Sequence, residues 1–90
     1  MSYTAILAYS GLVSEIPDEL IPFITFKAGL EKRNVSGNDK VVVLRVDKTD
    51  SYYPIFADER TTMDSILKEL RTLDTIPNDV AMNELRRVFG

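Results

Sequence analysis

The spacing of the hydrophobic positions changes once along the chain, close to Thr61. Before that point, short runs either alternate between apolar and polar residues or are apolar at every position, and both patterns are typical of β-strands. After it, apolar residues recur every three to four positions, which is typical of amphipathic helices. The pattern predicts strands over 3–9, 23–32, 40–47 and 52–58, followed by two helices.

The segment 23–32 has two interpretations, a helix or a strand. A helix would hold Gly29 in its interior, which costs about 1 kcal/mol. As a strand, its apolar positions alternate cleanly, and the turn-rich stretch RNVSGND joins it to the valine-rich run 40–47. We therefore expect these two segments to form an antiparallel hairpin, in the register that places Lys27 across from Asp47.

Two further segments bear on the borders of the sheet. The run 52–58 contains Pro54, which cannot donate a hydrogen bond to a neighbouring strand, so we expect this strand at an edge. Residues 12–21 form either a short strand or one helical turn, and the sequence does not separate these alternatives. The expected sheet is antiparallel and has four strands.

The two helices each have one apolar stripe. The first begins at Thr61 or Thr62, either of which can cap it, and the second begins after Asn78, which is also a suitable cap. Residues 74–79 are interpreted as the connection between them. The stripes comprise Met63, Ile66, Leu67, Leu70 and Leu73 in the first helix and Ala81, Met82, Leu85, Val88 and Phe89 in the second. We therefore expect an α+β fold, with an antiparallel four-stranded β-sheet followed by a C-terminal αα-hairpin packed on one face.

Composition narrows the class of protein. Ninety residues, of which 44% are hydrophobic and 28% charged, are typical of one small globular domain, which we expect to span 1–90. The chain contains no cysteine and no histidine, so disulfides, zinc–thiolate sites and nucleophile–histidine pairs are excluded. We expect neither enzymatic activity nor a bound cofactor or metal. The start of the chain has neither a basic secretory region nor the length of a membrane span, so a cytoplasmic location is expected.

Acidic side chains near the strand ends are the remaining candidates for a metal site. Asp50, Asp58 and Glu59 could in principle hold a hard cation such as Mg²⁺. Their spacing matches no EF-hand loop, and acids are common in turns, so we interpret them as turn-forming residues.

Charge is distributed unevenly along the chain. The net charge is −3 and the pI is about 4.8, which disfavours non-specific attraction to nucleic acid. Residues 27–48, however, carry six basic and three acidic side chains. In the expected hairpin, these six basic residues gather on one ribbon, where five of them are candidate phosphate contacts: Lys27, Lys32, Arg33, Lys40 and Arg45. Beside it, Tyr52 and Tyr53 could stack on bases. Nucleic-acid or nucleotide binding is therefore the alternative function, although a solvated strand face is the simpler interpretation.

The strands carry more apolar residues than two helices can cover. The run 3–9 and the valine run are apolar on both faces, so the second face must be covered by 12–21 or by another chain. A large exposed apolar patch usually marks an interface, and the commonest closed assembly is a two-fold dimer. We expect a homodimer whose interface includes Tyr3, Leu7, Val41 and Val43. The leading function is thus a small, non-enzymatic protein–protein interaction module that acts as an adaptor, regulator or inhibitor, with no membrane partner. An accessory protein of a phage or mobile element would fit this description.

Overall fold

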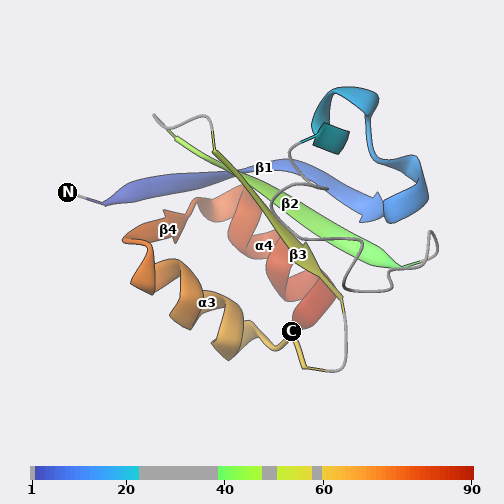
Figure 1. Cartoon of the computed structure of the whole chain (residues 1–90). Coiled ribbons are helices and arrows are strands. Elements are labelled where there is room, and N and C mark those ends of the chain that lie inside the picture. Colours follow the sequence, from blue (N-terminus) through green and yellow to red (C-terminus); the bar gives the residue numbers. More distant parts are fainter. Residues whose placement is uncertain (1, 23–38, 48–50, 58–59) are drawn as a thin grey trace.

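The computed structural model describes residues 2–22, 39–47, 51–57 and 60–90 (Figure 1). Four strands, two short 3₁₀ helices and two α-helices lie within these ranges. In chain order they are β1 (Tyr3–Leu12), η1 (Val13–Glu15), η2 (Asp18–Leu20), β2 (Lys40–Val46), β3 (Ser51–Phe56), α3 (Met63–Thr72), β4 (Thr75–Pro77) and α4 (Asp79–Phe89). The fold is therefore α+β, as the sequence predicts.

The four strands form a mixed sheet in the order β3-β2-β1-β4. β1 pairs with β2 and β2 with β3 in antiparallel fashion, whereas β4 runs parallel to β1. The expectation of a purely antiparallel sheet is wrong because the fourth described strand, β4, comes from the segment 74–79, which we interpreted as a simple connection. Both edges of β2 are occupied, by β1 and β3, so β2 has a different hairpin partner from the one predicted. The segment 23–32 itself lies outside the described residues.

Each of the two edge strands of this sheet contains a proline. Pro54 lies in β3, which confirms the prediction that this strand is at an edge, and Pro77 lies in β4. A proline has no N–H to offer to an added strand, and natural proteins place it at edges to discourage edge-to-edge pairing between molecules.

A β-bulge in β1 changes which side chains share a face of the sheet. Leu7 lies opposite Leu44, but the next pair is Tyr9 with Val43, so Ala8 is the extra residue. Before the bulge, Leu7 faces the same side as Leu44, toward the helices. After the bulge, Tyr9 faces the opposite side together with Val43.

Both α-helices begin at the residues that the sequence marks as caps. Ser65 donates its backbone N–H to Thr62 Oγ1 at 3.1 Å, and Thr62 donates its N–H to Ser65 Oγ at 2.9 Å, which forms a reciprocal capping box. The N–H of Ala81 donates to Asn78 Oδ1 at 2.9 Å. The helices are not joined by a turn alone, because β4 lies between them in the chain, so the predicted αα-hairpin is interrupted by a strand.

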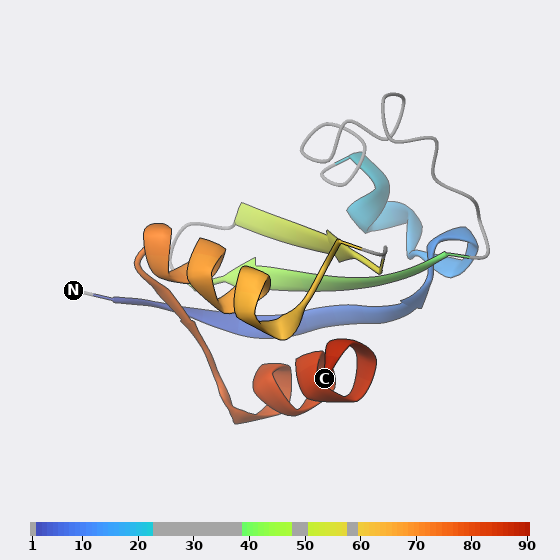
Figure 2. The same ribbon diagram turned by 90° about the horizontal axis from the view of Figure 1, so that it is seen from below.

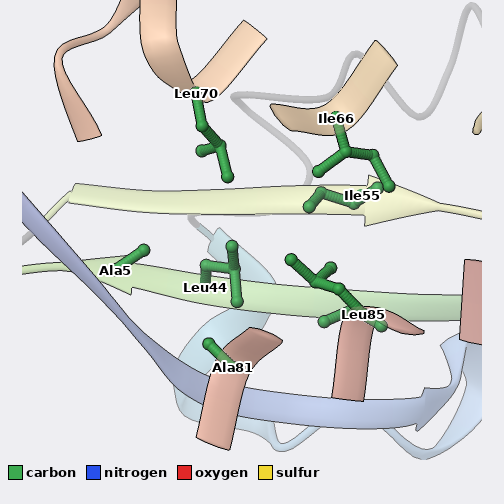
Figure 3. Packing of buried hydrophobic residues seen from close by; sticks show 8 residues of the cluster. Ala5, Leu44, Ile55, Ile66, Leu70, Ala81 and Leu85 are labelled. Carbon is green, nitrogen blue, oxygen red and sulfur yellow. The ribbon is translucent and has the colours of Figure 1, made fainter. Parts of the chain in front are cut away.

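The main core lies between the sheet and the two helices (Figures 1 and 2). Figure 3 shows Leu70 and Ile66 of α3 and Leu85 of α4 directed toward the strands. The buried residues of this cluster are Ala5, Val42, Leu44, Ile55, Ile66, Leu70, Ala81 and Leu85. Both helices thus contribute buried side chains to this cluster.

The second face of the sheet is covered by the 3₁₀ segment that follows β1 (Figure 1). Ile16 and Leu20, each 8% exposed, pack with the valines of β2 and with Phe56 of β3. The alternative that the sequence left open for 12–21 is therefore decided: it forms helical turns, and it covers the second face.

Candidate interaction surface

The four residues predicted to form an interface do not share a surface. Val41 and Val43 are both 0% exposed, beneath the 3₁₀ segment, so they cannot be the contact with another chain. Tyr3 and Leu7 lie on the opposite face, toward the helices, because of the register in which β1 pairs with β2. Leu7 is half-buried against the core, and Tyr3 is 41% exposed. Of the predicted set, Tyr3 is the residue that is exposed at the surface.

Exposed apolar side chains gather instead around β4. Among the described residues, five large apolar side chains are exposed, and four of them lie in β4, within a few residues of it in the chain, or on its strand partner. These four, which we call the β4 patch, are Tyr3 (41%), Leu73 (49%), Ile76 (59%) and Val80 (62%). The fifth is Ile21. Figure 1 shows β4 at the end of the sheet where the chain begins.

The backbone around β4 holds these side chains in place. Asp74 has φ of 53°, a left-handed conformation that ends α3 and turns the chain into the strand. Its carbonyl accepts a hydrogen bond from the N–H of Tyr3 at 2.8 Å, and the N–H of Asn78 donates to the carbonyl of Ala5 at 2.9 Å. The β4 patch is therefore anchored to the sheet at both ends of β4.

The patch extends around the edge of the sheet. Tyr3 pairs with Thr75, which is buried, and both face the helix side. Ile76 pairs with Thr4 and faces the other side. A protein that covered the whole patch would have to contact both sides of this edge.

On the helix side, the patch opens into a groove between α3 and β3. The groove has a volume of about 600 Å³, and Tyr3 and Leu73 belong both to its lining and to the patch. Ser65 and Glu69 of α3 line it together with Leu73, the residue after the end of α3, at positions four residues apart that share one side of a helix. The groove and the patch are thus one continuous surface.

The predicted basic ribbon is not assembled among the described residues. Lys40 and Arg45 lie at opposite ends of β2 and on opposite faces of the sheet. Tyr52 and Tyr53 also face opposite sides, since each packs against a different core cluster. Arg45 and Tyr52 are cross-strand neighbours and line a recess of about 480 Å³ beside η2.

The other three candidate phosphate contacts, Lys27, Lys32 and Arg33, lie outside the described residues, and so do Asp50, Asp58 and Glu59. Nucleic-acid binding therefore stays a prediction from the sequence. Within the described ranges, no group of three or more acidic side chains is placed to hold a metal ion. No helix in these ranges is long and apolar enough to cross a membrane.

A charged interaction joins two residues of α4 and reaches β1. Arg87 donates two hydrogen bonds to the Glu84 carboxylate, at 2.6 and 2.7 Å, and Ser10 donates another. These bonds lower the pKa of Glu84 from 4.5 to about 2 and raise that of Arg87. On the second face, burial, reinforced by the charge of Glu15, raises the pKa of Tyr9, whose hydroxyl donates to the carbonyl of Leu12 at 2.6 Å. The Glu84 interaction connects α4 with β1, whereas the Tyr9 hydrogen bond lies within β1, and neither lies at the β4 patch.

Comparisons with known proteins give a family and one relative. A family model described as "Domain of unknown function (DUF749)" matches residues 3–89. The uncharacterized protein MJ0858 of Methanocaldococcus jannaschii is 26% identical to the chain over 69 residues. The alignment covers 77% of the chain and 61% of the relative, so the chain spans less than two thirds of the length of that relative. No solved structure matches the chain.

Proposed function

We propose that the chain, which belongs to the DUF749 family, is a small, non-enzymatic module that binds another protein through the β4 patch. The distribution of exposed apolar side chains carries this proposal. Among the described residues, four of the five large exposed apolar side chains lie in or around β4, a strand of three residues. Single exposed apolar residues are ordinary on soluble proteins, whereas a concentration of them at one place is typical of interaction sites.

Covering the patch would contribute usefully to binding. Complete burial of a valine, leucine or isoleucine is worth about 1.5–3 kcal/mol relative to exposure. Ile76 and Val80 are 59% and 62% exposed, so roughly 1–2 kcal/mol is still available at each of them. With Tyr3 and Leu73 included, the patch offers roughly 4–6 kcal/mol before the costs of association. Such a contribution suits an adaptor, regulator or inhibitor that forms reversible complexes.

The residue types of the chain support a function without catalysis. The sequence lacks histidine, the commonest general base near neutral pH, and cysteine, an intrinsically strong nucleophile. Self-association, which the sequence predicts, would have to use a surface other than Val41 and Val43, because these residues are buried.

The proposal is tested by comparing two matched variants of the tagged chain. In Ile76→Asp, a charge is placed in the patch, whereas Ile21→Asp makes the same change at an exposed isoleucine outside it. Proteins that co-purify from an extract of the source organism are quantified by mass spectrometry, after circular dichroism has shown that both variants are folded. We expect a partner that is retained by the wild type and by Ile21→Asp and lost from Ile76→Asp. Equal recovery with both variants would refute the proposal.

A further inference from the structure

We propose that the occupant of the β4 patch is a peptide segment of another protein in which basic residues flank apolar ones, seated in the adjoining end of the α3–β3 groove. This inference rests on the proposed function and specifies the chemistry of the partner. Three observations lead to it: the charges around the patch, the side of α3 that faces the groove, and the nature of the sheet edge.

The charged side chains near the patch are mainly acidic. Asp74 and Asp79 are exposed and adjoin Leu73 and Val80 in the chain. The backbone N–H of Asp47 donates to the carbonyl of Thr4 at 2.7 Å, and Thr4 is in turn the strand partner of Ile76. Asp47, Thr4 and Ile76 therefore lie side by side on adjacent strands, so the Cα atoms of Asp47 and Ile76 are about 10 Å apart. The border of any partner surface that covers the patch would therefore lie close to these three carboxylates.

The side of α3 that faces the groove is acidic, like the surroundings of the patch. Glu69 lines the groove between Ser65 and Leu73, whereas the two basic residues of the helix, Lys68 and Arg71, do not line it. Helix geometry places Lys68 about 100° around the axis from Glu69, and Arg71 about 200°. Among the described residues, the cation that lines the groove is Arg60, which adjoins Thr61 at the end away from Leu73. The end of the groove beside the patch is therefore acidic.

A basic side chain of a partner would have two favourable contacts at this end. Its charge would interact with Glu69, and an arginine could also stack on the exposed ring of Tyr3, which lines the same groove. The apolar side chains of the segment would contact Leu73 and Ile66 in the lining. Charge complementarity of this kind governs the choice of partner more than the strength of binding.

A second copy of the chain fits this surface poorly. In a two-fold dimer through the patch, each acidic rim would face the same rim on the other copy, which is unfavourable. Pairing of the two β4 edges is also disfavoured, because Pro77 removes an N–H donor from a strand of three residues. Nucleic acid is repelled by the same carboxylates. The observations therefore favour a basic segment of a different protein.

A phage-displayed library of random short peptides, selected on the full-length chain, tests the inference. We expect the selected peptides to combine large apolar residues with a clear excess of lysine and arginine. Their binding should weaken roughly thirtyfold in Leu73→Asp and roughly tenfold in Glu69→Lys, and it should weaken as salt is added. Lys68→Glu is the matched control, because it reverses a charge on the same helix away from the groove, and it should leave affinity unchanged within about a factor of two.

Four outcomes would overturn the inference. The selected peptides could lack a basic excess, their affinity could be indifferent to Glu69→Lys, or no selected peptide could depend on Leu73. Light scattering that found a dimer of the wild type and a monomer of Leu73→Asp would make a second copy the occupant, and it too would overturn the inference. In each case a partner lost from Ile76→Asp in the co-purification would still support the proposed function, so the two proposals fail separately.

Discussion

Leu20→Ala measures directly how much the 3₁₀ segment contributes to the fold. Leu20 is 8% exposed and packs over the second face of the sheet with Val41 and Val43. The substitution removes three carbon atoms, worth about 0.8 kcal/mol each in transfer free energy, and the cavity left behind adds to that cost. Because the site lies beneath a single layer that can partly collapse, we expect a total loss of about 2–3 kcal/mol. This is a large share of the stability of a small domain and corresponds to a fall of roughly 10–20 °C in Tm.

Urea denaturation followed by far-UV circular dichroism provides the assay. The slope of the transition should stay that of the wild type, so the change appears in the midpoint. Leu73→Ala is the matched control, since the same atoms are removed from a side chain that is 49% exposed, and it should cost less than about 1 kcal/mol. If Leu20→Ala shifts the midpoint no further than Leu73→Ala does, the 3₁₀ segment does not cover the second face, and the reasoning is refuted.

Three other substitutions test the core and its electrostatics. Val43→Glu should unfold the chain, as measured by circular dichroism, because an unpaired charge at a fully buried site costs more than about 4 kcal/mol. A variant that stays folded but has a lower mass in solution than the wild type would instead support an interface at this face. Leu70→Ala should lower the free energy of unfolding by roughly 3–5 kcal/mol in urea, since Leu70 is 1% exposed, and an unchanged midpoint would mean that its stripe is not core. The pKa of Glu84 is lowered from 4.5 to about 2, so its stabilising effect is complete above about pH 4.5 and is lost as the pH falls toward 2. Glu84→Gln should therefore be less stable than the wild type at pH 7, by at most about 1 kcal/mol because the Arg87 side chain of the pair is 65% exposed. The two proteins should be equally stable near pH 2, and a difference that persists there would contradict this assignment.

Local features could be predicted from the sequence because nearby residues determine them. The cap of α3 depends on Thr62 and Ser65, three positions apart, and that of α4 depends on Asn78 and the backbone of Ala81. The edge position of β3 follows from the missing N–H of Pro54 alone. The apolar stripes of the two helices likewise follow from a repeat that is visible within ten residues.

Features that depend on distant pairing could not be predicted in this way. β4 has three residues, and its partner on β1 lies some seventy positions away, so residues 74–79 have the local pattern of a connection. The bulge at Ala8, which decides the faces that Leu7 and Tyr9 occupy, likewise follows from pairing with β2.

The exposed β4 patch cannot be predicted from the sequence for the same reason. The sequence pattern makes Tyr3 a candidate interface residue, but it places Leu73 in a core stripe. Ile76 and Val80 are large apolar residues within an otherwise polar stretch, and this was the available signal. Their exposure becomes apparent only when β4 is placed at the edge of the sheet.

Site-specific photo-crosslinking in living cells tests the central claim, that the β4 patch contacts another protein, most directly. A photoreactive amino acid replaces Ile76 in one variant and Ser14 in another; Ser14 is exposed in η1, beyond the opposite end of β1. After irradiation, the adducts are separated by mass and identified by mass spectrometry. We expect a defined adduct with another protein from position 76 and none from position 14. The absence of an adduct at position 76, or the same adducts from both positions, would contradict the claim.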